Sequence, residues 1–510
     1  MSGLRKMIGF NMVTSTVILS LLVLGAQGSI VPVPSGVDAL NNAGEDAPSP
    51  SSSSVTERWF QQKLDHFTAS DDRHWKQRYF INDKFYKPGG PAFLYIGPEV
   101  ALPAIYAEKG AWLEYAKTHD AIGFALEHRY YGKSRPTTDV STANLRYLSV
   151  EQALEDLASF IVACNKEHNL KDIKWITFGG SYGGLLSTWM RLKFPHLVAG
   201  AVAHSAPLAV PTIAPEYLVG AGEDMRIVPG CYETVSAAFD KVREILKTDS
   251  GVKTLQNLFR VCNFDQTNRL DVENLMMDLV TPIVSTIQFN NINPGTLMLI
   301  PNQTISSMCN VLTDKTTGSP LQRLAEYARI YNQNYTVQKD QCRNTTFASL
   351  VSTGSVINYE NNDGFSIRQW RYQQCTQIGV FVATTSDRQP LGNAVSEDYY
   401  YKICEGMFGP AFNQSLVKRG HDDIIMNYGG LDIRVTNVIY TQGTDDPWIK
   451  YGFTRNPNPR AYAVVVKGVG HVAAILPSST SDSVDLKNAR LEIQRLIGQF
   501  ISSRDPAIVG

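Results

Sequence analysis

A serine flanked by glycines is the residue of this sequence best suited to covalent chemistry. Ser181 lies within Gly179-Gly180-Ser181-Tyr182-Gly183-Gly184, which fits the pattern G-x-S-x-G. A buried-strand pattern at 173–178 precedes this turn, and a helical pattern at 183–194 follows it. A serine at a sharp strand-to-helix turn is held exposed above a sheet, where the Tyr182 N–H faces a developing oxyanion. We therefore predict that Ser181 is a nucleophile and that Tyr182 contributes to an oxyanion hole.

Two other interpretations of this turn give Ser181 no catalytic role. The glycines could serve packing alone, or they could cradle a phosphate group. Phosphate binding is typical of a lysine at P-loop spacing or of a G-x-G-x-x-G motif. Neither accompanies the turn, so the nucleophile remains the favoured interpretation.

A nucleophilic serine needs a base, and the base needs an acid that orients it. The late strand pattern at 435–440 runs into a loop that contains Asp445 and Asp446, and the next strand pattern runs into Gly468-Val469-Gly470-His471. In α/β-hydrolases the chain order is serine, acid, histidine, from loops that follow strands. His204 also follows a strand, but it precedes both acids. Asp446 and His471 are therefore the predicted acid and base.

The loop after an early strand usually supplies the second oxyanion donor. Here that loop is Gly97-Pro98-Glu99-Val100. Because Pro98 has no N–H, Glu99 or Val100 would have to donate, and we assign the role to Glu99. The mechanism needs no metal and no organic cofactor.

Strand and helix patterns alternate from about residue 76 to 204 and resume after about 435. Such alternation is typical of a parallel sheet flanked by helices. The stretch between looks mainly helical and holds six of the seven cysteines. We expect an α/β-hydrolase domain at 57–208 and 426–510, interrupted by a helical, disulfide-linked cap at 209–425.

The first residues look like a secretory signal. A small basic region precedes an apolar run of about a dozen residues, too short for the roughly 20 that span a bilayer. We expect a cleaved signal peptide at 1–28 and a flexible arm or pro-segment at 29–56, and no stable membrane insertion. Four Asn-x-Ser/Thr sequons agree with secretion: Asn302, Asn334, Asn344 and Asn413.

The composition argues against a nucleic-acid partner. The hydrophobic fraction of 43% supports a sizeable core, and the net charge of −1 offers no general attraction for nucleic acid.

The cysteines predict disulfides. An even set of cysteines in a signal-bearing chain is typical of a disulfide framework, although six cysteines allow fifteen pairings. None forms a C-x-x-C pair, so a zinc site is unsupported. Cys164 stands apart, in an apolar helical context that predicts a buried free thiol.

The chain as a whole resembles a known family, that of lysosomal prolyl carboxypeptidase, lysosomal dipeptidyl peptidase and thymus-specific serine protease. The resemblance covers about residues 57 to 503. It rests on the following motifs: Gln61-Gln62-Lys63-Leu64-Asp65-His66-Phe67, Glu127-His128-Arg129-Tyr130-Tyr131-Gly132, Leu148-Ser149-Val150-Glu151-Gln152-Ala153-Leu154, the Ser181 turn, Trp370-Arg371-Tyr372-Gln373-Gln374-Cys375-Thr376, Asp446-Pro447-Trp448 and the Gly-x-x-His that ends at His471.

The resemblance implies the same three catalytic residues and a helical cap over them. It also implies the disulfide pairings Cys231–Cys309, Cys262–Cys342 and Cys375–Cys404. Four departures lie near the expected pocket and put the family's specificity for proline in doubt: Val100, Gln442, Gln377 and the run Val472-Ala473-Ala474.

The sequence thus predicts a secreted or lysosomal serine peptidase, an exopeptidase with cleavage after proline as one option. An esterase or lipase with the same triad is an alternative that acyl-ester hydrolysis without peptide cleavage would favour. A non-catalytic secreted binding protein is a second, although its usual sign is a broken triad. The expected partner is a peptide, with a homodimer and the end of the peptide that is trimmed both left open.

Overall fold

An eight-stranded sheet forms the centre of the computed structural model, which describes residues 55–209, 211–292, 304–334, 342–359 and 366–503. The strand order is β1-β2-β4-β3-β5-β6-β9-β10, with β1 and β2 antiparallel and the strands from β4 onward parallel. This arrangement confirms the predicted α/β-hydrolase fold. The strands are β1 (Val55–Lys63), β2 (His74–Asn82), β3 (Ala92–Ile96), β4 (Ile122–Leu126), β5 (Trp175–Gly180), β6 (Val198–His204), β9 (Val438–Gly443) and β10 (Ala461–Val466).

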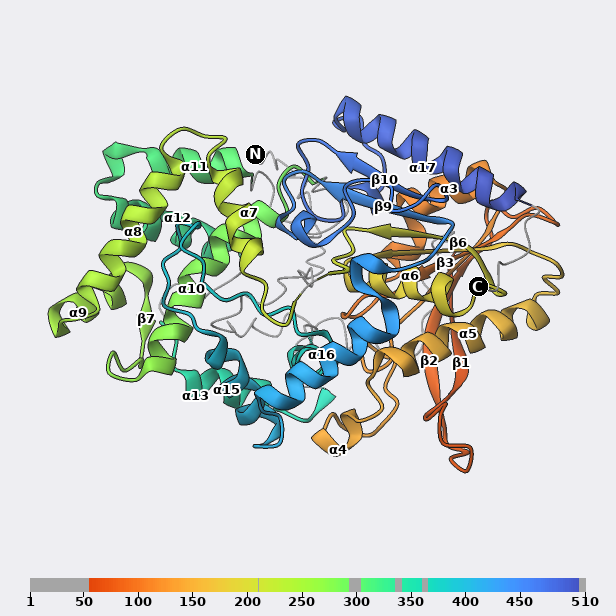
Figure 1. The fold of residues 1–510 in the computed structure, drawn as a ribbon, viewed down its shortest axis with the longest axis horizontal. Coiled ribbons are helices and arrows are strands. Elements are labelled where there is room, and N and C mark those ends of the chain that lie inside the picture. The colour runs from red at the N-terminus through yellow and green to blue at the C-terminus, as the bar shows by residue number, and fades with distance from the viewer. Residues whose placement is uncertain (1–54, 210, 293–303, 335–341, 360–365, 504–510) are drawn as a thin grey trace, which may run out of the picture.

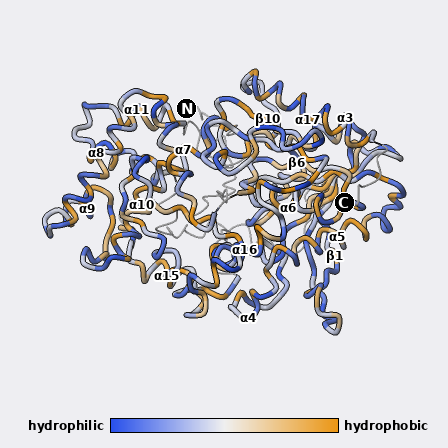
Figure 2. The backbone as a smooth tube through the Cα atoms, in the orientation of Figure 1, coloured by the Kyte–Doolittle hydropathy of each residue, from blue (hydrophilic) through white to orange (hydrophobic). Residues whose placement is uncertain are grey.

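The central strands are apolar because helices cover both faces of the sheet. Helices α3 (Ala111–Thr118) and α17 (Val484–Ser502) pack on one face, and α5 (Val150–Glu167) and α6 (Tyr182–Lys193) pack on the other (Figure 1). Hydrophobic segments run through the sheet and its covering helices, whereas the outer loops are mostly hydrophilic (Figure 2). The predicted site residues lie at the carboxyl edge of the parallel strands.

A helical cap is inserted between β6 and β9 and forms a second lobe beside the sheet (Figure 1). Its helices are α7 (Pro215–Met225), α8 (Cys231–Ile245), α9 (Asp249–Phe259), α10 (Arg269–Gln288), α11 (Ile305–Thr313), α12 (Pro320–Asn334), α13 (Phe347–Gly354), α14 (Ile367–Gln373), the π-helical turn η3 (Gln374–Ile378), α15 (Glu397–Phe408) and α16 (Gln414–Tyr428). Shorter elements are α2 (Ile105–Glu108), α4 (Thr142–Leu145), the strand pair β7 (Val261–Cys262) and β8 (Arg343–Asn344), η1 (Lys315–Thr317), η4 (Gly430–Asp432), η5 (Pro447–Tyr451) and η6 (Ala473–Ile475).

Three disulfides staple the cap, and their pairings are those that the resemblance implies. They join Cys231 to Cys309, Cys262 to Cys342 and Cys375 to Cys404. Cys164 is a buried free thiol, and burial raises its pKa.

Two expected boundaries differ from the observed elements. The arm was expected to extend to residue 56, but Val55 already pairs with Asn82 in the sheet. The cap was expected to end at 425, but α16 continues to Tyr428 because Gly429, with a φ of 86°, provides the left-handed residue that ends the helix. The expected signal peptide and Asn302 lie outside the described residues. No helix in the described ranges is long and apolar enough to cross a membrane.

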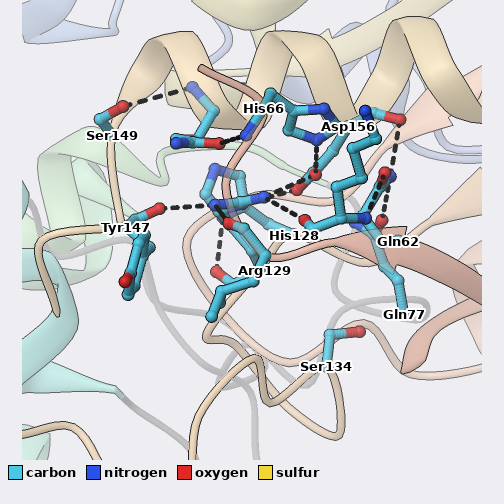
Figure 3. A network of polar contacts seen from close by, with 12 residues as sticks. Gln62, His66, Gln77, His128, Arg129, Ser134, Tyr147, Ser149 and Asp156 are labelled. Carbon is cyan, nitrogen blue, oxygen red and sulfur yellow. Dashed lines mark hydrogen bonds and ion pairs between the residues drawn. The ribbon is translucent and has the colours of Figure 1, made fainter. Parts of the chain in front are cut away.

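A buried ion-pair network explains several of the recognised motifs (Figure 3). The Arg129 guanidinium donates to the Asp156 carboxylate through Nε at 2.6 Å and Nη2 at 2.7 Å, and to the carbonyls of Leu64 and Tyr147. His66 Nε2 lies 2.8 Å from Asp156 Oδ1. The network ties the β1–β2 hairpin and the loop after β4 to α5.

Candidate active site

Ser181 stands in an unusual backbone conformation between β5 and α6. Its φ is 55° and its ψ is −121°, a region that non-glycine residues rarely occupy, and its side chain is buried. The backbone packs so closely around the glycines beside Ser181 that a side chain there would meet neighbouring backbone atoms. A Cβ added to Gly179 would lie 2.0 Å from the Gly183 carbonyl oxygen, and one added to Gly184 would lie 3.1 Å from the His204 carbonyl oxygen. The G-x-S-x-G pattern is thus the sequence signature of this tight turn.

Asp446 and His471 form a fully buried pair at the same edge. His471 Nδ1 lies 2.8 Å from Asp446 Oδ2, and both side chains have no exposed surface. The other carboxylate oxygen of Asp446 accepts a hydrogen bond from the Trp448 N–H at 3.0 Å. A carboxylate at Nδ1 favours the tautomer with the proton there. His471 Nε2 is then left as an acceptor.

The loop of His471 packs directly on the Ser181 turn. A Cβ added to Gly180 would lie 2.9 Å from Val472 Cγ1, so the residue after the histidine touches the residue before the serine. Ser181 Oγ and His471 Nε2 are both buried and have no hydrogen-bond partner among the described residues. A hydroxyl and an imidazole nitrogen without partners can supply the donor and the acceptor of a serine–histidine bond, which in ligand-free sites is often long and tightens only when substrate binds.

The two predicted oxyanion residues also lie at this edge. Tyr182 begins α6, so its N–H is among the free amides of a helix N-terminus. The loop after β3 crosses the first turn of α6, since a Cβ on Gly183 would lie 3.2 Å from the Ile96 carbonyl oxygen and 3.9 Å from Pro98 Cα. Glu99 follows in that loop and is 3% exposed.

The far end of cap helix α10 forms part of the site, which the sequence did not indicate. The His471 N–H donates to the Gln288 carbonyl at 2.6 Å, and the Gly470 N–H donates to the Asn290 carbonyl at 2.7 Å. The Asn290 side chain donates to Asp445 Oδ2 at 2.7 Å. A Cβ on Gly470 would lie only 2.4 Å from the Gln288 oxygen. The glycine before the histidine was a usable signal, but nothing local pointed to its partner in the cap.

The Gln288 side chain links the same helix to the acid loop. Its Oε1 accepts hydrogen bonds from the Tyr217 hydroxyl at 2.8 Å and from Trp448 Nε1 at 3.1 Å. Trp448 in turn donates its backbone N–H to Asp446. The cap therefore seats the loops of both the predicted acid and the predicted base.

A second cap helix contacts the residue after the serine. Gln373 Nε2 donates to the Tyr182 hydroxyl at 2.8 Å, His128 Nε2 lies 3.2 Å from the same hydroxyl, and the Trp370 ring lies 5.7 Å from the Tyr182 ring. Burial lowers the pKa of His128 to about 4. It is therefore neutral near pH 7 and adds no charge beside the turn.

His204 is built into the sheet edge as a neutral residue. Its Nδ1 pairs with Thr441 Oγ1 at 2.8 Å, and burial lowers its pKa to about 3. It has no carboxylate at Nδ1, which agrees with its lower rank as a base. In the described part of the chain, no cluster of three or more His, Cys, Asp and Glu is placed to hold a metal ion.

Two of the four predicted glycosylation sites are exposed. Asn344 lies on β8, and Asn413 caps α16, where its Oδ1 accepts from the N–H groups of Ser415 and Leu416. Asn334 ends α12.

Comparison with known proteins identifies a family. The family model described as serine carboxypeptidase S28 matches residues 62–493. The mouse (Mus musculus) thymus-specific serine protease is 30% identical, over 87% of this chain and 87% of its own. The human (Homo sapiens) lysosomal Pro-X carboxypeptidase is 28% identical, over 86% of this chain and 87% of its own. The solved structure of a proline iminopeptidase from Mycobacterium smegmatis covers 88% of this chain and 100% of its own, with a TM-score of 0.38 and 10% identity.

Proposed function

Because this chain belongs to the serine carboxypeptidase S28 family and is a serine peptidase, we propose that Ser181, Asp446 and His471 are its catalytic triad and that it is an exopeptidase. The observation that carries the triad is the buried His471–Asp446 pair, 2.8 Å long, beside a serine held in a strained turn. These residues come from loops after three different strands. Packing alone gives no reason for them to meet at one edge.

The proposed mechanism proceeds through an acyl-enzyme. Ser181 Oγ attacks the scissile carbonyl as His471 Nε2 takes its proton, and Asp446 holds the imidazole and stabilises the imidazolium. The N–H groups of Tyr182 and Glu99 bind the oxyanion. His471 then gives the proton to the leaving amine, and a water activated by the same imidazole hydrolyses the ester and restores the serine.

The substrate is proposed to be a peptide that is trimmed at one end, with cleavage after proline. One relative's name supports proline before the cut, because it specifies Pro-X carboxypeptidase activity for that protein. The cap supports trimming near an end of the peptide. The end of α10 contacts the His471 loop and α14 contacts Tyr182, so cap helices lie against the edge of the sheet where the proposed triad is.

We also propose that the protein works in the secretory or lysosomal compartment. Three disulfides in the cap favour an oxidising environment. The predicted signal at 1–28 and the exposed sequon residues Asn344 and Asn413 agree with glycosylation on that route.

The test is cleavage of a mixed peptide pool by secreted wild-type protein and by Ser181→Ala, followed by mass spectrometry at acidic and neutral pH. Ser187→Ala is the matched control, because Ser187 is a buried serine of the same helix that bonds to Thr177 at 2.8 Å. We expect cleavage by wild type and Ser187→Ala only. The fragments will show which end is trimmed and whether proline precedes the cut. Acyl-ester hydrolysis without peptide cleavage would instead favour an esterase.

A further inference from the structure

Two buried glutamates follow neighbouring strands and differ sharply in their surroundings. Glu127 follows β4 and has no exposed side-chain surface. Its carboxylate pairs with Arg78 and accepts hydrogen bonds from Leu102 N at 2.9 Å, Lys133 N at 3.0 Å and Ser134 Oγ at 2.8 Å. It is a fully satisfied structural carboxylate.

Glu99 follows β3, the next strand in the sheet, and has the opposite character. Its side chain is buried, yet neither carboxyl oxygen has a hydrogen-bond partner among the described residues. A buried polar group without a partner destabilises the fold. Among the residues that the structure describes, the Glu127 carboxylate is fully paired and the Glu99 carboxyl is not, so Glu99 is open to a partner from outside the chain.

The location of Glu99 indicates what that partner is. Pro98, the residue before Glu99, has its Cα 3.9 Å from a Cβ placed on Gly183 in the first turn of α6. Burial, and to a smaller extent the Glu99 charge, raises the pKa of Tyr95 on β3, Tyr131 in the loop after β4 and Tyr182 on α6. Tyr182 directly follows Ser181. None of these neighbours is a cation, and the histidine that contacts the Tyr182 hydroxyl, His128, is neutral near pH 7. The Glu99 loop thus crosses the first turn of the helix that begins directly after Ser181, and neither Tyr182 nor its contact His128 supplies a positive charge there near pH 7.

We propose that the Glu99 side chain binds the main chain of the peptide substrate, donating a hydrogen bond to a carbonyl beside the scissile bond and accepting one from an N–H. The inference rests on the proposed role of Ser181. A neutral carboxyl has one donor and an acceptor, which match the C=O and N–H of an extended peptide residue. This is a role for the side chain, separate from that of the Glu99 N–H in the oxyanion hole.

The protonation state follows from the burial of this group. Burial raises the pKa of Glu99 to about 8, so the donor proton is present below that pH. Above it the carboxylate forms, loses its donor and repels the substrate carbonyl. Substrate turnover should therefore fall as the pH rises through about 8.

The test compares kcat/KM from pH 5 to 10 for wild type, Glu99→Gln and Glu99→Ala. Each is assayed with a peptide that has a free amino terminus and with its N-acetylated form. The Gln side chain keeps a donor and an acceptor but does not titrate. We expect Glu99→Ala to lose about tenfold in kcat/KM on both peptides. We expect Glu99→Gln to stay within a few-fold of wild type and to lack the fall above pH 8.

Stability measurements separate binding from folding. Removing an unpaired buried carboxyl should leave the thermal midpoint of Glu99→Ala unchanged or raised, whereas Glu127→Ala, which breaks a satisfied pair, should lower it strongly. The inference is overturned if Glu99→Gln is as impaired as Glu99→Ala, or if its fall above pH 8 persists. A drop in midpoint that accounts for the lost activity, or an effect confined to the free-amine peptide, would also overturn it. Ser181→Ala, assayed in parallel, reports separately on the triad.

Discussion

At the residue scale, the chemistry of this protein depends on a few side chains whose geometry is fixed by their neighbours. Ser181 holds a backbone conformation that costs about 1–3 kcal/mol. The structure supports it with Gly179, where an added Cβ would lie only 2.0 Å from the Gly183 carbonyl oxygen. Asp446 is held in place in a similar way, because one carboxylate oxygen pairs with His471 and the other accepts a hydrogen bond from the Trp448 N–H.

Asp446→Asn should leave the fold intact and lower kcat by about 10⁴. The amide is the same size, but its NH₂ group stabilises the wrong imidazole tautomer and cannot balance an imidazolium. Steady-state kinetics of peptide cleavage check this result, with circular dichroism as the folding control. A kcat within tenfold of wild type would contradict the assigned acid, and Asp445→Asn would then be the variant to compare.

Gly179→Ala should prevent the turn from forming as observed. The added Cβ would overlap the Gly183 carbonyl oxygen at 2.0 Å, so the strand, the serine or the helix must shift. We expect loss of activity and a lower free energy of unfolding by about 2 kcal/mol or more, measured by urea denaturation. Normal stability together with normal activity would show that the turn is looser than described.

At the element scale, cap helix α10 contacts the proposed site, because the Gln288 carbonyl at its end accepts a hydrogen bond from the His471 N–H. Asn290→Ala removes the side-chain bonds to Asp445 and to the Ile305 N–H and loosens the acid loop that holds Asp446, and we expect kcat to fall about tenfold with little change in KM. Asn427→Ala is the matched control, since Asn427 is an exposed asparagine of α16 far along the chain from this contact. Equal kinetics for the two variants would remove the proposed positioning role.

The buried carboxylate of Asp156 holds the loop after β4 and the β1–β2 hairpin in place through Arg129 and His66. Asp156→Ala would leave Arg129 charged and unpaired in the core, where its exposed fraction is 0%. Such a change typically destabilises by about 3–5 kcal/mol. Chemical denaturation measures it. A loss below about 1 kcal/mol would mean that the carbonyls of Leu64 and Tyr147 already satisfy Arg129.

The element scale also shows where sequence reasoning succeeds and where it stops. The sequence predicts Ser181, Asp446 and His471 as a group because each follows a recognisable strand, and parallel strands carry their carboxyl ends to one edge. The roles of Gln288 and Asn290 had no such signal. They depend on how the cap docks onto the sheet, a contact between residues far apart in the sequence. The unpaired state of Glu99 was equally hidden, because Glu99 and Glu127 look alike until their partners are known.

At the scale of the whole molecule, the site lies between an α/β domain and a disulfide-stapled cap. The alternation of patterns predicted both, and the predicted fold is confirmed. The cysteine pairing could not be derived from the residues, since spacing alone leaves fifteen choices. Only the family resemblance selected the three that the structure contains.

Opening the Cys375–Cys404 disulfide should weaken the cap and activity together. The bond closes a loop with a sequence separation of 29 and holds η3, next to α14, against α15. The paired change Cys375→Ser and Cys404→Ser should destabilise the cap by about 3 kcal/mol. Limited proteolysis and peptide cleavage measured on the same samples check this. Faster proteolysis of the cap with unchanged turnover would show that α14 does not position the site.

The most direct test of the central claim is to locate the covalent adduct formed with a small organophosphonate that reacts with activated serines. Peptide mapping by mass spectrometry after labelling should place one adduct on Ser181. His471→Ala, which removes the base, should slow labelling by several orders of magnitude. An adduct on another serine, or equally fast labelling of Ser181 without His471, would contradict the triad proposed for this peptidase.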